Sequence, residues 1–267
     1  MAAEYLEISR NILELSRKDV EAINYWTSIL QIAGADGFLK GGFIRDKVAN
    51  RIKGMTLIPN DFDILVTGKI HCVLQTAIKN GAEVIERRRR KGTPVFKYKV
   101  PWFEDMTFET GVAMGTVANY DTADFKLIRS DDAKNTDLNV NSMSIHLIPG
   151  KISLFDPLSA VDSITRGEVS LNDWHSLYRN PENILRAFRI ADRINCKLTK
   201  KTLDIFSTHA HVIGNIKRPF LDSQIIPLIN SPNASQIWLQ MKTLGITKYL
   251  MGGGIVTLDK AREVFKL

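Results

Sequence analysis

Two short stretches constrain the fold and the chemistry of this chain more than any other part of its sequence. The first is Gly41-Gly42-Phe43-Ile44-Arg45-Asp46, and the second, Asn-Asp-Phe-Asp-Ile-Leu-Val, occupies residues 60–66. The apolar residues just before the glycine pair predict a short strand that breaks at the glycines, and a helix is expected from about Arg45 to Ile52. The chain is then expected to return through a loop to a strand that carries Asp61 and Asp63.

The spacing of these two aspartates favours a shared role. Side chains alternate along a strand, so Asp61 and Asp63 would lie on one face while Phe62 and Ile64 enter a core. Neighbouring carboxylates repel each other unless a cation lies between them, and Mg²⁺ prefers oxygen ligands completed by substrate phosphates. Glycines that follow a strand let the backbone approach a phosphate closely. The combined pattern indicates a metal-assisted phosphoryl or nucleotidyl transfer site.

These motifs resemble the head of the class II tRNA nucleotidyltransferase (CCA-adding enzyme) and bacterial poly(A) polymerase family, within the polymerase-β-like superfamily. That family opens with Gly-Gly-x-Val-Arg-Asp and continues with Asp-x-Asp. The resemblance extends from residue 37 to about 250 and implies an α+β head with a small mixed, mostly antiparallel sheet. An all-helical neck and a short body would follow. We therefore predict a nucleotidyltransferase head at 1–170 and a helical neck with a truncated body at 171–267.

The resemblance also implies roles for individual residues in the head. The catalytic residues would be Asp61 and Asp63, which would bind two Mg²⁺ ions. Glu109, in a strand expected at 106–114, is a candidate third metal ligand, and an ordinary exposed glutamate is the alternative. The nucleotide ligands expected in the head are Gly41, Gly42 and Arg45.

The segment 132–143 resembles the family's Asp-Leu-x-Arg-Arg-Asp-Phe-Thr-Ile-Asn-Ala-Leu but departs from it at two positions. Asp137 keeps the pattern and is an expected nucleotide ligand. Asn135 and Thr136 replace an arginine pair that, in the family, helps to hold the phosphates and sugar of the incoming nucleotide. Either nucleotide affinity is weaker in this chain, or another arginine or lysine substitutes.

A second departure concerns the choice of base. Residues 184–194 resemble the family's neck helix, in which Arg186 matches an arginine that contacts the nucleotide. Just upstream, Asn180 and Asn183 replace the Asp and Arg whose edges act as a protein template for the base. An ionised Asp only accepts hydrogen bonds and an Arg only donates them, whereas an Asn does both. Both asparagines remain expected nucleotide ligands, but the base preference either differs or is relaxed.

A run of cations at 87–91 has two interpretations. It comprises Arg87, Arg88, Arg89, Arg90 and Lys91. An RNA-contacting arm and a solvated loop or strand rim both fit such a run, although five consecutive cations repel each other and an anionic ligand would relieve the repulsion. The formal net charge of +7 agrees with a nucleic-acid or nucleotide partner.

Composition sets wider bounds. The 267 residues are 44% hydrophobic and 24% charged, which suits one large or two ordinary domains. The sequence has no long apolar run that predicts a membrane span and no signal-peptide pattern at its start, so a cytoplasmic protein is expected. Cys72 and Cys196 have no metal-ligand spacing and are interpreted as reduced core thiols. The five histidines show no metal-ligand cluster, and His209 and His211 are expected on one helix without sharing a face.

The sequence therefore predicts a template-independent nucleotidyltransferase that adds nucleotides from ATP, CTP or both to an RNA 3′ end, most simply that of tRNA. A poly(A) polymerase-like enzyme, or one with another acceptor, is the first alternative. A non-catalytic relative that binds NTP or RNA is the second, and the retention of both Asp61 and Asp63 argues against it. Because the RNA-holding tail of the family looks absent or reduced, a homodimer or a partner that supplies an RNA-binding surface is a further expectation.

Overall fold

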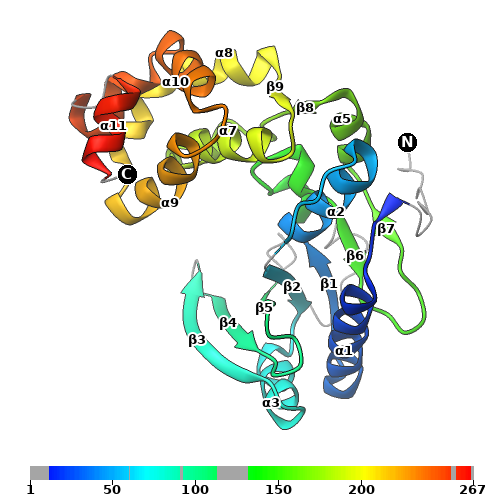
Figure 1. Ribbon diagram of the computed structural model, residues 1–267. Coiled ribbons are helices and arrows are strands. Elements are labelled where there is room, and N and C mark those ends of the chain that lie inside the picture. Colours follow the sequence, from blue (N-terminus) through cyan, green and yellow to red (C-terminus); the bar gives the residue numbers. More distant parts are fainter. Residues whose placement is uncertain (1–11, 60, 91–92, 113–131, 254–256, 266–267) are drawn as a thin grey trace. The chain divides into compact units, whose positions relative to one another are not determined.

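The computed structural model describes residues 12–59, 61–90, 93–112, 132–253 and 257–265. The chain forms two compact units, the first made of residues up to 136 with 140–165 and the second of 137–139 with 166–267. Figure 1 labels the elements of both units. None of the helices in these ranges combines the length and the hydropathy that a membrane crossing needs.

The first unit is a seven-stranded mixed sheet with helices. Its strands run in the order β3-β4-β5-β2-β1-β6-β7, and only β2 and β5 are parallel neighbours. This confirms the predicted small, mostly antiparallel sheet. Its elements are α1 (Arg17–Ala33), β1 (Asp36–Lys40), α2 (Gly42–Lys53), β2 (Asp61–Thr67), α3 (Ile70–Lys79), β3 (Glu83–Arg90), β4 (Thr93–Lys99), β5 (Thr107–Val112), a 3₁₀ turn at Asn139–Asn141, β6 (Ser144–His146), β7 (Leu154–Phe155) and α5 (Ala160–Arg166).

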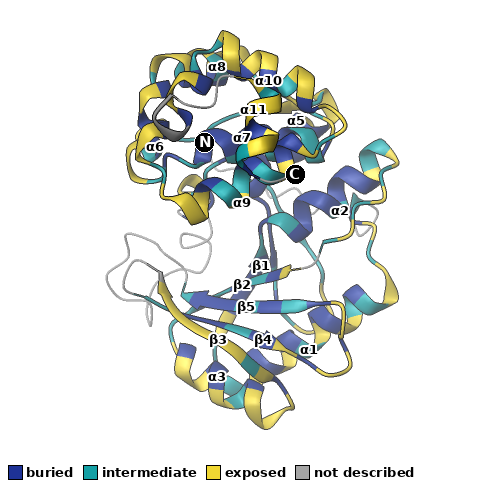
Figure 2. Cartoon of the chain, turned by 60° about the vertical axis from the view of Figure 1, so that its left-hand side comes forward, coloured by how far each residue is buried: buried dark blue, intermediate teal, exposed yellow. Residues whose placement is uncertain are grey.

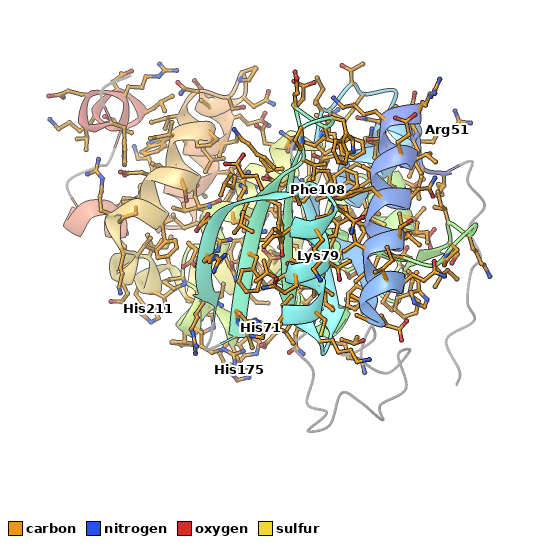
Figure 3. The ribbon with its side chains drawn as sticks, turned by 90° about the horizontal axis from the view of Figure 1, so that it is seen from below. Arg51, His71, Lys79, Phe108, His175 and His211 are labelled. Atoms are coloured by element: carbon orange, nitrogen blue, oxygen red, sulfur yellow. The ribbon has the colours of Figure 1, made fainter. Side chains whose placement is uncertain are left out.

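One face of this sheet is covered by helices and is closely packed. Trp26 of α1 contacts the rings of Tyr98 and Phe108, and Phe43 of α2 lies 4.1 Å, between ring centroids, from Phe62. Helices α1 and α3 pack against each other in front of the sheet (Figure 3). In Figure 2 the central strands are dark blue, whereas the edge strand β3 is largely yellow. Because the aromatic residues fill one face, the residues that alternate with them line the other.

Local signals in the sequence fix the ends of the helices. Ser16 caps α1, since its hydroxyl accepts a hydrogen bond from the Asp19 amide while the Asp19 carboxylate accepts one from the Ser16 amide. Gly34 ends the same helix in the left-handed conformation. Helix α2 begins at Gly42, three residues before the position expected from the sequence.

The prediction that both cysteines are core thiols is wrong. Cys72 is exposed and Cys196 is half-buried, and the two do not form a disulfide. Cys72 lies on α3, whose buried side chains, Ile70, Val73, Leu74 and Ala77, recur at helical spacing and leave position 72 on the outer surface.

The second unit is helical and holds one short pair of parallel strands, β8 and β9. Its elements are β8 (Glu168–Val169), α6 (Ser176–Arg179), α7 (Asn183–Arg193), β9 (Lys197–Leu198), α8 (Lys200–Thr208), a 3₁₀ segment at Ala210–Asn215, α9 (Arg218–Ile229), α10 (Ala234–Thr243), a 3₁₀ segment at Ile246–Gly253 and α11 (Leu258–Val264). Residues 137–139 join this unit through a bridge between Leu138 and Leu171.

The buried Tyr98 hydroxyl makes the stability of the first unit sensitive to alkaline pH. Burial raises the Tyr98 pKa to about 12, and its hydroxyl lies 2.9 Å from that of Thr110. The unfolded chain loses this proton near pH 10, so stability falls as pH rises from 10 to 12, by about 2 to 3 kcal/mol. We expect Tyr98→Phe to remove this part of the alkaline loss, measured by denaturant unfolding between pH 8 and 12.

The matched control is Tyr249→Phe, at a tyrosine of the second unit that is 39% exposed. It should change the alkaline loss much less than Tyr98→Phe does. The same loss in both variants would contradict the assignment to Tyr98.

Candidate active site

The open face of the sheet carries the predicted catalytic carboxylates. Asp61 and Asp63 alternate along β2 with the buried side chains of Phe62 and Ile64, as the sequence predicts. Glu109 of the parallel strand β5 is the register partner of Asp63 and therefore lies on the same face. The strands thus bring all three expected acidic residues to one side of the sheet.

The turn between β1 and α2 lies directly beside these carboxylates. Gly41 has φ of +82°, a conformation that favours glycine. A Cβ atom built on Gly41 would stand 3.3 Å from Asp63 Oδ2, and one on Gly42 would stand 3.4 Å from a terminal nitrogen of Arg45. The glycine pair therefore keeps the backbone close to Asp63 on one side and to the Arg45 guanidinium on the other.

Arg45 is buried in the first unit. Its Nε and one terminal nitrogen donate to Asp46 Oδ1 at 2.9 and 2.7 Å, and its other terminal nitrogen donates to Asn141 Oδ1 at 2.8 Å. The side chain of Arg45 is only 7% exposed. The guanidinium thus lies beside the glycine turn, held by Asp46 and Asn141, and its expected role as a ligand of the triphosphate stays a prediction.

Cationic side chains on the open face form ion pairs with the carboxylates. Lys97 of β4 places its Nζ 3.3 Å from Asp61 Oδ1, and Arg88 of β3 forms an ion pair with Glu109. Sequence reasoning missed Lys97, although its alternation with Phe96 and Tyr98 along the predicted strand places it on the face opposite the core. Asp61 and Glu109 are therefore each partly neutralised by a neighbouring cationic side chain.

The donor set of this face suits Mg²⁺. Within the described ranges, no three or more side chains of His, Cys, Asp or Glu gather closely enough to hold a metal ion. Mg²⁺ is usually held by only one or two carboxylates together with substrate phosphates, and Asp61 and Asp63 offer such a pair. Because Glu109 is engaged by Arg88, its role as a third ligand stays a prediction.

Only part of the predicted cationic arm lies on the open face. Its arginines are in the edge strand β3, where Arg88 pairs with Val95 and Arg87 with Phe96 of β4. Alternation therefore directs Arg88 to the carboxylate face and Arg87 and Arg89 to the opposite one. Arg90 ends the strand, and Lys91 lies outside the described residues.

The remaining expected nucleotide ligands, one from the predicted head (Asp137) and three from the predicted neck (Asn180, Asn183 and Arg186), all belong to the second unit. Asp137 and Arg186 are brought together, with Arg186 Nε 2.8 Å from Asp137 Oδ2. Asn180 ends α6, and its carbonyl accepts a hydrogen bond from the amide of Asn183 at the start of α7. The two departures from the family's template positions are thus linked through their backbones.

A mixed sheet that carries paired carboxylates beside a Gly-Gly turn, in a chain that continues into a helical unit, has the fold of a nucleotidyltransferase head and neck. The chain belongs to the poly A polymerase head domain family, whose model matches residues 37–170. A similar protein is the CC-adding tRNA nucleotidyltransferase of Geobacter sulfurreducens, 23% identical over 125 residues, or 47% of this chain and 29% of that protein.

Solved structures of CCA-adding enzymes share the fold. A CCA-adding enzyme in complex with CTP superposes with a TM-score of 0.75 at 17% identity, over 94% of this chain and 58% of that chain. The Thermotoga maritima CCA-adding enzyme complexed with tRNA gives 0.76 at 17% identity, over 98% and 60%. The present chain thus spans less than two thirds of the length of these relatives.

Proposed function

We propose that this protein is a template-independent nucleotidyltransferase that adds nucleotides from NTP to the 3′ end of an RNA, in the first instance a tRNA. The observation that carries the proposal is the position of Asp61 and Asp63 on one open face beside the Gly41 turn. Membership of the poly A polymerase head domain family and the fold shared with CCA-adding enzymes support it.

In this proposal each residue has a distinct task. Mg²⁺, when bound, would activate the attacking 3′-hydroxyl and neutralise the charge that develops on the leaving pyrophosphate. Asp61 and Asp63 would hold it, and the Gly41-Gly42 backbone would give the triphosphate room to approach. Arg186, oriented by Asp137, would contact the nucleotide from the neck.

Cations other than the family's arginine pair are needed for the triphosphate, because Asn135 and Thr136 are neutral. We expect Lys97 to supply one of them, since it lies on the carboxylate face and its ammonium group would be available to the triphosphate when Asp61 holds Mg²⁺. Lys97→Met should raise the KM for NTP about tenfold with a smaller change in kcat, because one charge-assisted contact is worth roughly 1.5 kcal/mol. Steady-state kinetics with saturating RNA would measure this.

The control for Lys97 is Lys79→Met, at an exposed lysine in the last turn of α3, a helix that packs against α1 rather than on the carboxylate face. It removes the same charge and should leave KM within about twofold. Equal KM values for the two variants would rule out a specific contact from Lys97.

The activity is tested with radiolabelled ATP, CTP, GTP and UTP supplied singly, with Mg²⁺ and three acceptor conditions. These are tRNA lacking its 3′ end, total cellular RNA and the protein alone. One or two nucleotides added to the tRNA would support the proposal, and the labelled base would reveal what the Asn180 and Asn183 positions select. NTP binding without transfer to any RNA would overturn it in favour of another acceptor or a binding role.

The departure at Asn180 and Asn183 favours a second candidate, a nucleotidyltransferase of the same chemistry with altered base selection or a different acceptor. Label that enters the protein itself or a minor RNA, but not tRNA, would select this candidate.

Light scattering during size-exclusion chromatography would decide separately whether a homodimer or a partner supplies RNA-binding surface, because a monomer active alone needs neither.

A further inference from the structure

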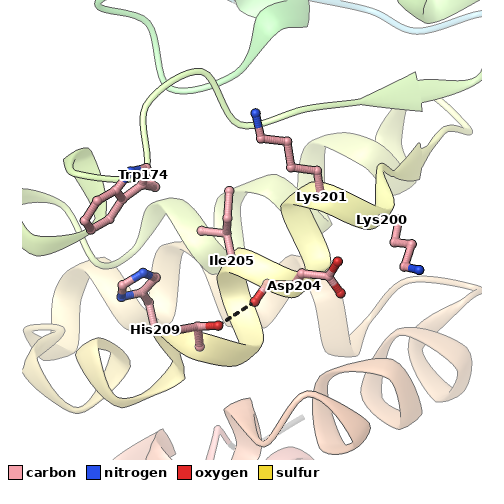
Figure 4. A pocket seen from close by; sticks show the side chains of 7 residues that line it. Trp174, Lys200, Lys201, Asp204, Ile205 and His209 are labelled. Carbon is pink, nitrogen blue, oxygen red and sulfur yellow. Dashed lines mark hydrogen bonds between the residues drawn. The ribbon is translucent and has the colours of Figure 1, made fainter.

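A groove on the second unit has no task in the proposed reaction. It lies between the segment that precedes α6 and the outer surface of α8, is open to solvent, and has a volume of about 500 Å³ (Figure 4). Its lining residues are Trp174, Lys200, Lys201, Asp204, Ile205, Thr208 and His209. The groove is therefore aromatic and apolar along one part and basic at another.

The aromatic part is a preorganised stack at the surface. The Trp174 ring stacks on His175 with centroids 3.6 Å apart and on His209 with centroids 5.0 Å apart. The Tyr178 hydroxyl lies 3.1 Å from His209 Nδ1, which fixes the histidine ring. Trp174 and Tyr178 nevertheless remain 39% and 57% exposed. Large rings held in place but left in contact with water are suited to stacking against a planar ligand.

The fixed position of His209 depends on a break in the helix. The sequence predicts that His209 and His211 share one helix, but α8 ends at Thr208 and a 3₁₀ segment follows. The two histidine rings therefore lie 6.3 Å apart, and the Tyr178 ring is within 6.4 Å of both. The helix end thus adds His209 and His211 to the aromatic surface around Trp174.

The basic part is formed by Lys200 and Lys201, both exposed, in the first turn of α8. Cations at a helix N-terminus oppose the helix dipole, and this first turn contains no acidic residue to offset them. Neither lysine forms an ion pair with a residue in the described part of the chain. The acidic lining residue, Asp204, is outnumbered by the two ammonium groups. A bound anion would offset the positive charge that the two lysines add to the N-terminus of α8.

We propose that this groove binds single-stranded RNA, with a base stacked against the Trp174–His209 pair and the adjoining phosphates held by Lys200 and Lys201. Aromatic platforms flanked by cations recognise single strands in this way, because every base has a π-face and every nucleotide a phosphate. The choice of RNA rests on the proposed function, whereas the groove's preference for a single strand rests on its rings and lysines.

The lysines are tested by comparing two double variants of the full chain. K200Q/K201Q removes both cations of the groove, and K242Q/K248Q removes two exposed lysines elsewhere in the second unit. Fluorescence anisotropy with a labelled 12-nucleotide RNA, without NTP or Mg²⁺, should show about tenfold weaker binding for K200Q/K201Q only. Its salt dependence should also fall by about 1.4 in slope, the value for two lost phosphate contacts with a single strand. Equal weakening in both variants, or none in K200Q/K201Q, would overturn the proposal.

The stack is tested by photo-cross-linking to an oligonucleotide that contains 5-bromouridine, followed by mass spectrometry. Cross-links at Trp174, Tyr178 or His209 support the proposal, and cross-links confined to the first unit overturn it. Loss of the Trp174 cross-link in K200Q/K201Q would show that the aromatic stack and the two lysines bind the same RNA.

These outcomes are separable from those of the transfer assay. A protein that transfers nucleotides but binds RNA independently of Lys200 and Lys201 would overturn the groove alone. A protein that binds through the groove but transfers nothing would overturn the proposed function alone.

Discussion

Replacing Asp63 with asparagine is expected to lower the rate of nucleotide transfer by about 10³-fold or more while the fold is kept. Asparagine has the same shape but lacks the charge that a divalent cation needs, and such a loss corresponds to roughly 4 kcal/mol in the activation barrier. Because Asp63 is partly exposed on β2, the stability of the variant should change little. Single-turnover incorporation of α-labelled NTP, with circular dichroism to follow unfolding, would measure both quantities.

Asp36→Asn is the control for this substitution. Asp36 is exposed at the opposite end of β1, where its register partner is Thr67 rather than Asp63. Its rate should stay within about twofold of the parent. Full activity of Asp63→Asn at ordinary Mg²⁺ concentrations would rule out the metal-binding role of that carboxylate.

Arg45→Met is expected to destabilise the protein by about 3 to 5 kcal/mol, the usual cost of removing one partner of a buried ion pair. The substitution removes the guanidinium that neutralises buried Asp46 and also the hydrogen bond that reaches Asn141. Denaturant unfolding would measure the loss. Arg51→Met, on the exposed side of the same helix, should cost less than about 0.5 kcal/mol.

The same variant distinguishes two roles for Arg45. If the guanidinium only supports the glycine turn, the turn should relax in Arg45→Met. The variant, assayed well below its unfolding temperature, should then show both a lower kcat and a higher KM. If it binds the triphosphate as the family resemblance implies, KM should rise with stability nearly unchanged. A normal unfolding free energy would therefore contradict the supporting role.

Much of the first unit follows from patterns within a few residues of each other. Alternation places Asp61 and Asp63 opposite Phe62 and Ile64, and the glycine pair ends β1 where the sequence predicts. Family resemblance adds what local pattern cannot supply, because it gives one expected role to Asp137 and Arg186, residues 49 positions apart that the structure brings together. Their role as nucleotide ligands stays a prediction.

Features that depend on distant partners escape this reasoning. Arg45 donates a hydrogen bond to Asn141, which is 96 residues away, so the motif alone does not reveal that its guanidinium is buried. The place of Lys97 beside Asp61 depends on which strands are neighbours, which no single strand reveals. The groove on the second unit requires α8 to stop at Thr208, although the apolar spacing does not mark that position.

The path of the chain through residues 136–140 has a consequence for anyone who wishes to dissect this protein. Asp137 to Asn139 belongs to the second unit, yet Asn141, two residues later, returns to the first and holds Arg45. No single cut can release the second unit intact, because a fragment that starts at residue 166 would lack Leu138 and the acidic partner of Arg186. Two separately expressed pieces should instead restore the second unit only by fragment complementation, in which the first piece supplies residues 137–139.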